Sequence, residues 1–391
     1  LDVTDPDHIE VSNLSRQFLF RNKDVKMSKS DVAVNYIKNK YPHLGTNAFN
    51  HKLTQENKNI VNELFEGKDI IINALDNNTA RRFIDSVCLE KCLPLFESGT
   101  MGMKGNTQPI IPYLTETYSD SHDGDEEKSF PVCTIKNFPN QIVHTIHWAR
   151  DYFEIFTRAF ENINKYKENP EFYKELSDFD SNQCIKDINM FCSKEYDDWT
   201  DIVYLVKDMF DERYYKEIKQ LLFCYPEDHM ISGELFWSNG KRCPKVIQHY
   251  MSTSIINYFE FTTKLICNIM DIESEFNREE LMQIMLDFQF PDFEPDSSKK
   301  IAKNDNELKE NSSNIETVQL NENLYIRKNY TPQYFEKDDD TNYHIKFITA
   351  ASNCRAEIYG IDISTEYDTK GIAGKIIPAV ATTTATVVGL I

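Results

Sequence analysis

The first part of the chain alternates short apolar runs with stretches of helical spacing. LDVTD predicts a strand that ends at Asp5, and DIIINAL (69–75) is a continuous apolar run, typical of a strand covered on both faces in a parallel sheet. Shorter strands are predicted at 93–96 and around Ile110. Strands that alternate with helices in this way favour an α/β domain built from βαβ units.

Amphipathic helices fill the intervals between these strands. Ser28 or Ser30 can cap the first helix, and Pro42 stops it. The apolar face of this helix carries Val32, Ala33, Tyr36 and Ile37. The second helix carries Ala80, Phe83, Ile84 and Val87 at helical spacing.

A different pattern begins near Tyr118, where an acidic loop, SDSHDGDEEKS, leads to PVCTIKNFPN and then to long, aromatic-rich helical segments. Residues 141–156 and 246–270 are the clearest of these helices. The pattern predicts a second, mainly helical domain over 119–330, in which the polar residues 294–330 form a mobile connection.

The last part of the chain returns to a pattern typical of packed structure. After FEKDDD, an amphipathic helix is predicted, and Gly360 is a plausible stop for it. Its apolar stripe consists of Tyr343, Phe347, Ala351, Cys354 and Ile358. The tail up to Ile391 is small and apolar, as buried elements are.

Length and composition limit the classes of function. At 391 residues and 40% hydrophobic content, more than one domain is expected, because single cores stop growing near ~250–300 residues. The excess of 63 acidic over 43 basic residues disfavours nucleic acid or an anionic membrane as the main partner. Apolar runs stay short of the ~20 residues that span a bilayer. The nine cysteines are spread along the chain without a CxxC pair, so we expect reduced thiols in a soluble, intracellular protein.

Acidic residues stand where the predicted strands end. Asp5 can accept hydrogen bonds from ribose hydroxyls, although a turn or cap is the alternative role. Asp76 follows the buried strand and offers a hard oxygen to Mg²⁺ on substrate phosphates, unless it caps the next helix. Asn77 suits either role.

Polar residues of SNLSRQFLF precede the first helix and could meet a polyphosphate. The segment supplies Asn13, Arg16 and Gln17, and Lys29 follows further along the chain. Arg16 offers a planar fork and Lys29 a point charge, so both could bind one triphosphate. Two solvated surface cations are the alternative.

Cys133 lies in PVCTIKNFPN, before the helix that begins near Asn140, with Lys136 three residues further on. A loop thiol beside a cation can be accessible and ionised, and therefore nucleophilic. An inert thiol is the alternative. His144 and His147 are better explained as helix residues than as a base for Cys133.

Eight segments resemble the ubiquitin-activating enzyme family and keep its order: TDPDHIEVSNLSRQFLFR, INALDN, ESGTMGMKGN, PYLTETYSDS, PVCTIKNFPN, ELFWSNGKRCP, FEKDDDTNYHIKFITAASNCRAE and AGKIIPAVATTTATVVGL. They cover residues 1 to about 160, 234–244 and 331–391. The first part is also similar to bacterial adenylating enzymes that prepare sulfur carrier proteins for molybdopterin and thiamine synthesis. The insertion with PVCTIKNFPN, and the lack of the zinc-binding cysteine pairs of those proteins, favour ubiquitin activation.

The resemblance implies an α/β fold: a Rossmann-like adenylation domain with a mostly parallel sheet, interrupted by a mainly helical catalytic-cysteine domain. Residues 1–118 would begin the adenylation domain, 119–330 would form the cysteine domain, and 331–391 would return to complete the adenylation domain.

The resemblance also implies an activity and the residues that carry it. With ATP and Mg²⁺, such an enzyme adenylates the C-terminal carboxylate of ubiquitin, captures it as a thioester on Cys133, and hands it to a conjugating enzyme. Asp76 would bind Mg²⁺, and Ser121 and Asp123 would touch the ubiquitin tail. The ATP-binding residues would be Asp5, Asn13, Arg16, Gln17, Lys29, Asp76 and Asn77.

The partners implied are ubiquitin and conjugating enzymes, with neither nucleic acid nor membrane, in the cytoplasm and nucleus. The family's glycine-rich loop, its inactive adenylation-like half and its C-terminal ubiquitin-like domain are missing, and the chain starts without Met, so we expect a fragment that is inactive alone. An activating enzyme for another ubiquitin-like modifier and a noncatalytic adenylation-like scaffold are the alternatives. The joint presence of Cys133, Arg16, Lys29 and Asp76 disfavours the scaffold.

Overall fold

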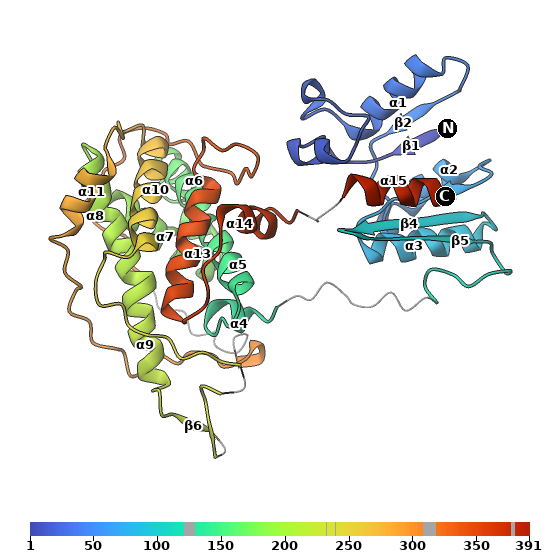
Figure 1. Ribbon diagram of the computed structural model, residues 1–391. Helices are drawn as coiled ribbons and strands as arrows, with labels where there is room; N and C mark the ends of the chain where they lie inside the picture. Colours follow the sequence, from blue (N-terminus) through green and yellow to red (C-terminus); the bar gives the residue numbers. More distant parts are fainter. Residues whose placement is uncertain (121–129, 232, 239, 308–317, 377–379) are drawn as a thin grey trace. The chain divides into compact units, whose positions relative to one another are not determined.

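The computed structural model describes residues 1–120, 130–231, 233–238, 240–307, 318–376 and 380–391, which fall into two compact units (Figure 1). The first unit consists of Leu1–Ser129 together with Ile376–Ile391, and the second of Phe130–Lys375. Each unit buries its own apolar core, so each is described by itself.

The first unit contains two small sheets with helices around them. One sheet pairs β1 (Asp2–Thr4) in parallel with β2 (Asn47–Phe49). In the other, β3 (Ile71–Ile72) is parallel to β4 (Leu95–Met101), which is antiparallel to β5 (Lys104–Ile110). The helices of this unit are α1 (Lys29–Lys40), α2 (Lys58–Phe65), α3 (Asn78–Glu90) and α15 (Ala381–Leu390), with short 3-10 turns at Val11–Ser15, Asn22–Asp24 and Gln55–Asn57.

Local sequence signals placed several elements of the first unit correctly. The strand that ends before Asp5 is β1, and the two amphipathic helices are α1 and α3. The Ser28 hydroxyl accepts a hydrogen bond from the amide of Asp31 at 3.3 Å and so caps α1. Asn77 caps α3 in the same way, through the amide of Ala80 at 2.8 Å.

The prediction of a long strand covered on both faces at 69–75 is wrong. Only β3, two residues long, forms there. Ile70, just before β3, is 44% exposed, and Ile72, within it, is 59% exposed. β3 pairs with β4 alone, so its other edge has no strand beside it within the described ranges. Because β3 is an edge strand, its backbone can form hydrogen bonds on one side only, and among the described residues no second strand covers the apolar side chains.

The fold class is therefore a mixed α/β arrangement with small sheets. Two strand pairs are parallel and one large pair, β4 with β5, is an antiparallel hairpin. A continuous, mostly parallel Rossmann-like sheet is not formed by the described residues. The hairpin arises because Gly102, with a φ of 60°, permits the tight reversal between the two strands.

The chain returns to the first unit only at its last helix. α15 packs on β4 and β5 (Figure 1), and a Cβ on Gly105 would lie 2.6 Å from a side-chain carbon of Val387. The glycine thus permits the close approach of helix and hairpin. The predicted return of all of 331–391 is wrong, because residues up to Lys375 belong to the second unit.

The second unit is mainly helical. A small hairpin pairs β6 (Met230–Ile231) with β7 (Glu234–Leu235). The α-helices are α4 (Val132–Lys136), α5 (Ile142–Phe153), α6 (Ile155–Glu168), α7 (Asp178–Cys192), α8 (Trp199–Phe210), α9 (Glu217–Cys224), α10 (Thr253–Met270), α11 (Arg278–Met285), α13 (His344–Ile358) and α14 (Glu366–Ala373), with a 3-10 turn at Phe172–Glu175 and a π-helical turn at Asp211–Lys216. None of the helices in the described ranges is long and apolar enough to cross a membrane.

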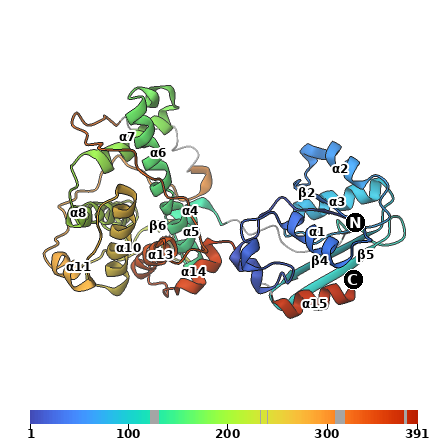
Figure 2. The same cartoon turned by 90° about the horizontal axis from the view of Figure 1, so that it is seen from above.

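The core of the second unit lies around α13, which packs against α5 and α10 (Figures 1 and 2). The ring of Phe347 on α13 lies 4.9 Å from that of Phe156, nearly perpendicular to it. The hydroxyl of Tyr214 donates a 3.0 Å hydrogen bond to the Ala351 carbonyl. The predicted amphipathic helix over 343–358 is confirmed, but it completes this core rather than that of the first unit.

Part of the predicted mobile connection is packed. The amide of Tyr325 donates to the Cys192 carbonyl at 2.8 Å, and the amide side chain of Asn164 bonds both the N–H and the carbonyl of Tyr330 at 2.8 Å. Three apolar side chains of this stretch lie against the core: Leu320, Leu324 and Ile326. The prediction of a mobile connection is therefore wrong for 318–330, because buried apolar contacts are interspersed among its polar residues.

Candidate functional site

Asp5, after β1, lies within electrostatic range of Lys29 at the start of α1 and of Asp76 after β3, and we call these three residues the Asp76 edge. Burial raises the pKa of Asp5; the charge of Lys29 lowers it, and that of Asp76 raises it. Asp7 also lies here, since its carboxylate pairs with the Lys29 ammonium at 2.9 Å. The carboxylate of Asp5 accepts the amide of Asp7 at 2.9 Å.

The structure decides which residue caps α3. The Asn77 side-chain oxygen takes that role, so Asp76 is not the cap. Asp76 is exposed, and it accepts one 3.1 Å hydrogen bond from the Asn77 amide nitrogen. An exposed carboxylate with free lone pairs at the end of a strand can receive a cation or a donor group from a ligand.

A buried ion pair supports the backbone just before Asp76. The Arg81 guanidinium donates to the Leu75 carbonyl through Nε at 3.1 Å and pairs with the fully buried Glu97 at 3.0 Å. Glu97 also accepts a 2.8 Å hydrogen bond from the Asn73 side chain. Burial raises the pKa of Glu97, and the bonds from Asn73 and Arg81 counter that rise. We conclude that Arg81 fixes the chain at the position that presents Asp76.

Sequence reasoning missed Arg81 and Glu97. A glutamate directly after the predicted strand at 93–96 was the available signal, because a carboxylate that continues a buried strand needs a cation. Gly99 on β4 gives Arg81 its space, since a Cβ there would lie 2.5 Å from the Arg81 Nη2. A local pattern cannot show that contact, because it joins a helix to a strand.

The other predicted phosphate-binding residues form a separate turn at 11–17. The buried Asn13 side chain accepts the Glu10 amide at 3.0 Å, and Arg16 donates to the Ser12 carbonyl at 3.2 Å. The side-chain oxygen of Gln17 is buried and accepts a hydrogen bond from no described residue. This turn is anchored to α1 by a small apolar cluster consisting of Ile9, Leu14, Leu19, Phe20, Val32 and Ala33. Within the described residues, none of these side chains contacts Asp76.

Cys133 lies in the second unit, on the short helix α4. We call residues 132–138, which are α4 and the two residues after it, the Cys133 turn. The side chain of Cys133 is 7% exposed. Both carboxylate oxygens of Asp305 face this turn: they accept the amides of Cys133 at 2.8 Å and of Val132 at 3.2 Å. Burial raises the pKa of the Cys133 thiol, and a hydrogen bond to Asp305 raises it further.

The prediction of an exposed loop thiol whose ionisation is favoured is therefore wrong for this conformation. The apolar surroundings and the Asp305 carboxylate both disfavour a thiolate. Lys136, the nearest cation along the sequence, counters instead the effect of burial on the pKa of Asp151. His144 and His147 lie on α5 as predicted, and burial lowers the pKa of both.

The far end of the Cys133 turn is held by α13. The buried Arg355 donates to the Lys136 carbonyl, and the Tyr359 hydroxyl, just after α13, donates to the Asn137 carbonyl at 2.9 Å. The guanidinium also lies 4.4 Å from the centroid of the Trp148 ring. Asp305 and Arg355 thus hold the turn from opposite ends, and both were missed by sequence reasoning.

Ser121 and Asp123, predicted to touch the ubiquitin tail, lie outside the described residues. The preceding residues are fixed to α3: the Asp85 carboxylate accepts the amides of Tyr118 at 3.2 Å and of Ser119 at 3.0 Å. Among the described residues, no group of three or more His, Cys, Asp or Glu could hold a metal ion by itself. All nine cysteines are free, as predicted.

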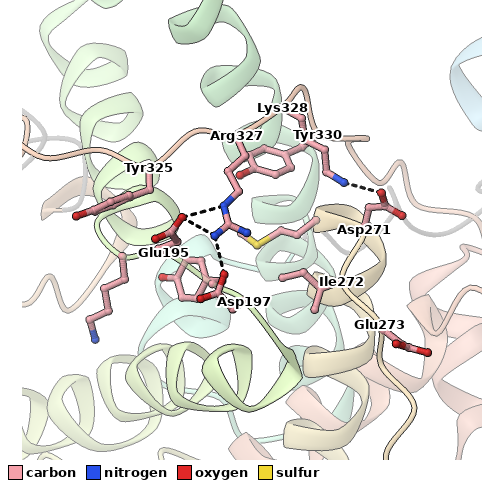
Figure 3. A pocket seen from close by; sticks show the side chains of 12 residues that line it. Glu195, Asp197, Asp271, Ile272, Glu273, Tyr325, Arg327, Lys328 and Tyr330 are labelled. Atoms are coloured by element: carbon pink, nitrogen blue, oxygen red, sulfur yellow. Dashed lines mark hydrogen bonds and ion pairs between the residues drawn. The ribbon is translucent and has the colours of Figure 1, made fainter.

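A cavity of about 290 Å³ in the second unit contains none of the predicted residues (Figure 3). Most of its charged side chains pair with one another: Arg327 binds Glu195 and, at 2.6 Å, Asp197, while Lys328 binds Asp271 at 2.5 Å. These pairs hold the extended stretch 318–330 against the turns that follow α7 and α10. Because these charges are already paired, the cavity is not the candidate site.

Comparisons with known proteins address the family. Residues 139–370 match the family described as "Ubiquitin-activating enzyme, SCCH domain". The chain is 39% identical over 406 residues to the Ubiquitin-like modifier-activating enzyme 1 of Homo sapiens, covering 100% of this chain and 38% of that protein. It is 39% identical over 414 residues to the Ubiquitin-activating enzyme E1 1 of Candida albicans, covering 100% and 40%. The chain spans less than half the length of these relatives.

Among solved structures, the crystal structure of E. coli MccB with MccA-N7isoASN aligns at 19% identity and a TM-score of 0.29. The alignment covers 32% of this chain and 37% of that one.

Proposed function

The chain belongs to the ubiquitin-activating enzyme family, and we propose that it supplies the ATP-dependent adenylation residues and the acceptor cysteine of such an enzyme. The enzyme would adenylate the C-terminal carboxylate of ubiquitin and then form a thioester on Cys133. The observation that carries this proposal is the Asp76 edge, where an exposed carboxylate that caps no helix lies within electrostatic range of Asp5, as Lys29 also does.

The residues of the Asp76 edge and of the 11–17 turn fit a nucleoside triphosphate by their chemistry. Asp5 would accept hydrogen bonds from ribose hydroxyls. Lys29 and Arg16 would meet phosphate oxygens, with Lys29 leaving Asp7 for the ligand. The buried acceptor of Gln17 supports a ligand in this region, since a buried polar atom without a partner is costly. Asn13 and Asn77 would hold the backbone of the two turns.

The donor set also fits a magnesium ion held together with substrate phosphates. Asp76 offers a hard carboxylate oxygen, and Mg²⁺ in nucleotide sites uses one or two carboxylates plus phosphate oxygens and water. When bound there, the ion would offset negative charge on the departing pyrophosphate. Arg81 and Glu97 would hold Asp76 in place by fixing the Leu75 carbonyl. The first unit would then be the adenylation domain.

Cys133 performs the second step of the proposed reaction. Its Sγ loses a proton and attacks the carbonyl carbon of the acyl adenylate; the C–S bond forms, the C–O bond to phosphate breaks, and AMP leaves with the electron pair. No oxidant or reductant is needed. Because Asp305 and burial hold the thiol protonated in this conformation, a reactive thiolate requires the Asp305 contact to weaken.

The partners proposed with this activity are ubiquitin, whose tail would meet Ser121 and Asp123, and conjugating enzymes that accept the thioester. A cytoplasmic and nuclear location is proposed with them. Nucleic acid and membranes are not proposed as partners, since the net charge is −20.

The test uses the full-length protein with Mg-ATP and ubiquitin on a non-reducing gel. We expect a reductant-sensitive adduct that disappears in Cys133→Ala while ATP–pyrophosphate exchange persists. Asp76→Ala should lose both the adduct and the exchange, and Cys92→Ala, which removes an exposed thiol of the first unit, should keep both.

Each contrary result has a distinct meaning. An adduct with another ubiquitin-like modifier but not with ubiquitin would keep the enzyme class and correct the substrate. Adducts that survive in Cys133→Ala would move the acceptor to another cysteine. Absence of both exchange and adduct in the unmodified protein would support a noncatalytic scaffold.

A further inference from the structure

The segment FWSNGKRCP, which follows the small hairpin of the second unit, places a lysine beside the Cys133 turn. The ammonium of Lys241 lies 4.0 Å from the centroid of the Phe236 ring and 5.2 Å from that of Phe138. Lys241 is half-buried, and it forms no ion pair with any carboxylate in the described ranges. A cation held over two aromatic faces, away from carboxylates, keeps its charge available to another neighbour.

That neighbour is Cys133. Phe138, whose ring lies beside the Lys241 ammonium, donates a backbone hydrogen bond to the Cys133 carbonyl at 3.3 Å, and the Asn137 amide donates to the same oxygen at 2.8 Å. Burial lowers the pKa of Lys241, and the charge on an ionised Cys133 opposes that effect. The lysine and the thiol therefore lie beside the same short stretch, residues 133–138, and the charge of an ionised Cys133 acts on Lys241.

The position of Lys136 makes this observation informative. Lys136 is the cation expected from the sequence to act on Cys133, but its influence falls on Asp151. Lys241 comes from a distant part of the chain and stands where Lys136 was expected. The charged groups that act on this thiol–lysine pair are Asp305, on the thiol, and Lys303, on the lysine.

We propose that Lys241 is the cation that stabilises the ionised form of Cys133, and so determines how readily the thiol becomes a nucleophile. Lys241 keeps its own proton, while the thiol proton passes to solvent, so no other group needs to change its charge. Because it acts through Cys133, Lys241 is a positioning residue rather than a catalytic one. What the thiolate attacks rests on the proposed function; the charge pairing itself does not.

Asp305 and Lys241 then have opposite effects on one sulfur atom. The Asp305 carboxylate disfavours a negative charge on Sγ, and the Lys241 ammonium favours it. With the amides of Val132 and Cys133 bonded to Asp305, the thiol stays protonated. When that carboxylate leaves, the charge of Lys241 remains beside the thiol, and the thiolate forms.

The experiment measures how fast iodoacetamide alkylates Cys133 across a range of pH, in the full-length protein without ATP or ubiquitin, with the modified peptide followed by mass spectrometry. Lys241→Met should shift the profile to higher pH and slow alkylation at neutral pH by about threefold to tenfold, the effect of up to one unit in a thiol pKa. Lys241→Arg keeps the charge and should restore most of the rate.

Lys245→Met is the matched control, because it removes the same charge from an exposed position four residues further along the chain. It should leave the alkylation profile unchanged. The inference is overturned if Lys241→Met has the unmodified profile, or if Lys241→Arg shifts it as much as Lys241→Met does, which would indicate a packing role.

The same variants separate this inference from the proposed function. If Lys241→Met shifts alkylation but the unmodified protein forms no adduct with ubiquitin, the charge pairing stands and the proposed function fails. If the unmodified protein and Lys241→Met form ubiquitin adducts at the same rate and their alkylation profiles are identical, the proposed function stands and the inference fails.

Discussion

The Asp76 edge and the Cys133 turn are both supported by an arginine, largely buried in the first case and fully buried in the second, but the charges of the two arginines are compensated differently. Arg81 donates to the Leu75 carbonyl, and its charge is matched by the fully buried Glu97. Arg355 donates to the Lys136 carbonyl, and within the described ranges no carboxylate pairs with it. Instead it lies over the ring of Trp148.

The two side chains proposed to act in the reaction differ in their exposure to solvent. Asp76 is exposed, whereas Cys133 is 7% exposed and bonded to Asp305. A neutral buried pair can present a charged side chain to solvent at a fixed position, which suits capture of a soluble nucleotide. A buried, protonated thiol is protected from chance reaction, which suits a nucleophile that must act only on its own substrate.

The largest expected effect is on Arg81→Met, which leaves Glu97 buried without its cation. Breaking a buried ion pair in this way costs ~3–5 kcal/mol. The loss should be greatest at neutral pH and smaller at mildly acidic pH. The pKa of Glu97 is already raised by burial and rises further without Arg81, so the native state takes up a proton that the unfolded state releases, and stability increases as pH falls. Urea unfolding at neutral and at mildly acidic pH, monitored by hydrogen exchange of the peptide that contains β4, measures both the loss of stability and its dependence on pH.

The neighbouring Arg82 provides the control for that change. It is exposed, and its replacement by Met should alter the free energy of unfolding by no more than about 0.5 kcal/mol. An equal loss in both variants, or a loss from Arg81→Met that does not depend on pH, would show that Glu97 is not the residue left unpaired.

A smaller effect is expected for Arg355→Met. The change removes a donor from the Lys136 carbonyl, which costs ~1–3 kcal/mol, but it leaves no carboxylate without a partner. The loss should therefore not vary between neutral and mildly acidic pH. Hydrogen exchange of the peptide that contains the Cys133 turn, measured during urea unfolding, reports this free energy.

Arg242→Met is the matched control for Arg355, because Arg242 also donates to a backbone carbonyl, that of Gly360 at 2.5 Å, but from an exposed position. Its loss should change stability by about 0.5 kcal/mol or less. If the destabilisation by Arg355→Met shrinks at acidic pH as that by Arg81→Met does, then a carboxylate near Arg355 shares its charge, and the contrast between the two arginines is wrong.

The two regions also differ in how much of each could be predicted from the sequence. Caps such as Ser28 depend on residues within one turn, so the starts of α1 and α3 were close to their predicted positions. Asp5 and Asp76 were each predicted at the carboxyl end of a strand, and the structure places them directly after β1 and β3. The sheet was predicted less well, because pairing along the edges of β3 depends on strands that a local pattern cannot identify.

The surroundings of Cys133 could not be predicted because their contacts are long-range. Asp305 lies 172 residues from Cys133, and Arg355 lies 219 residues from Lys136. No periodicity joins such positions. Proximity along the chain suggested Lys136 as the cation, whereas packing brought Lys241 to the thiol.

The smallest expected effect on stability, and the sharpest test of the contrast in exposure, is Asp305→Asn. The asparagine oxygen can still accept the amide of Cys133, but its NH2 group cannot accept the amide of Val132. Because Val132 is exposed and water can take that place, the free energy of unfolding should change by only about 1 kcal/mol. Burial would still raise the pKa of Cys133, but the contribution of Asp305 would be lost, so alkylation at neutral pH should become about threefold faster. Glu307→Gln removes the same charge two residues away and should leave the rate unchanged. A slower reaction in Asp305→Asn would mean that the carboxylate helps to remove the thiol proton, and that Cys133 is prepared for reaction rather than protected from it.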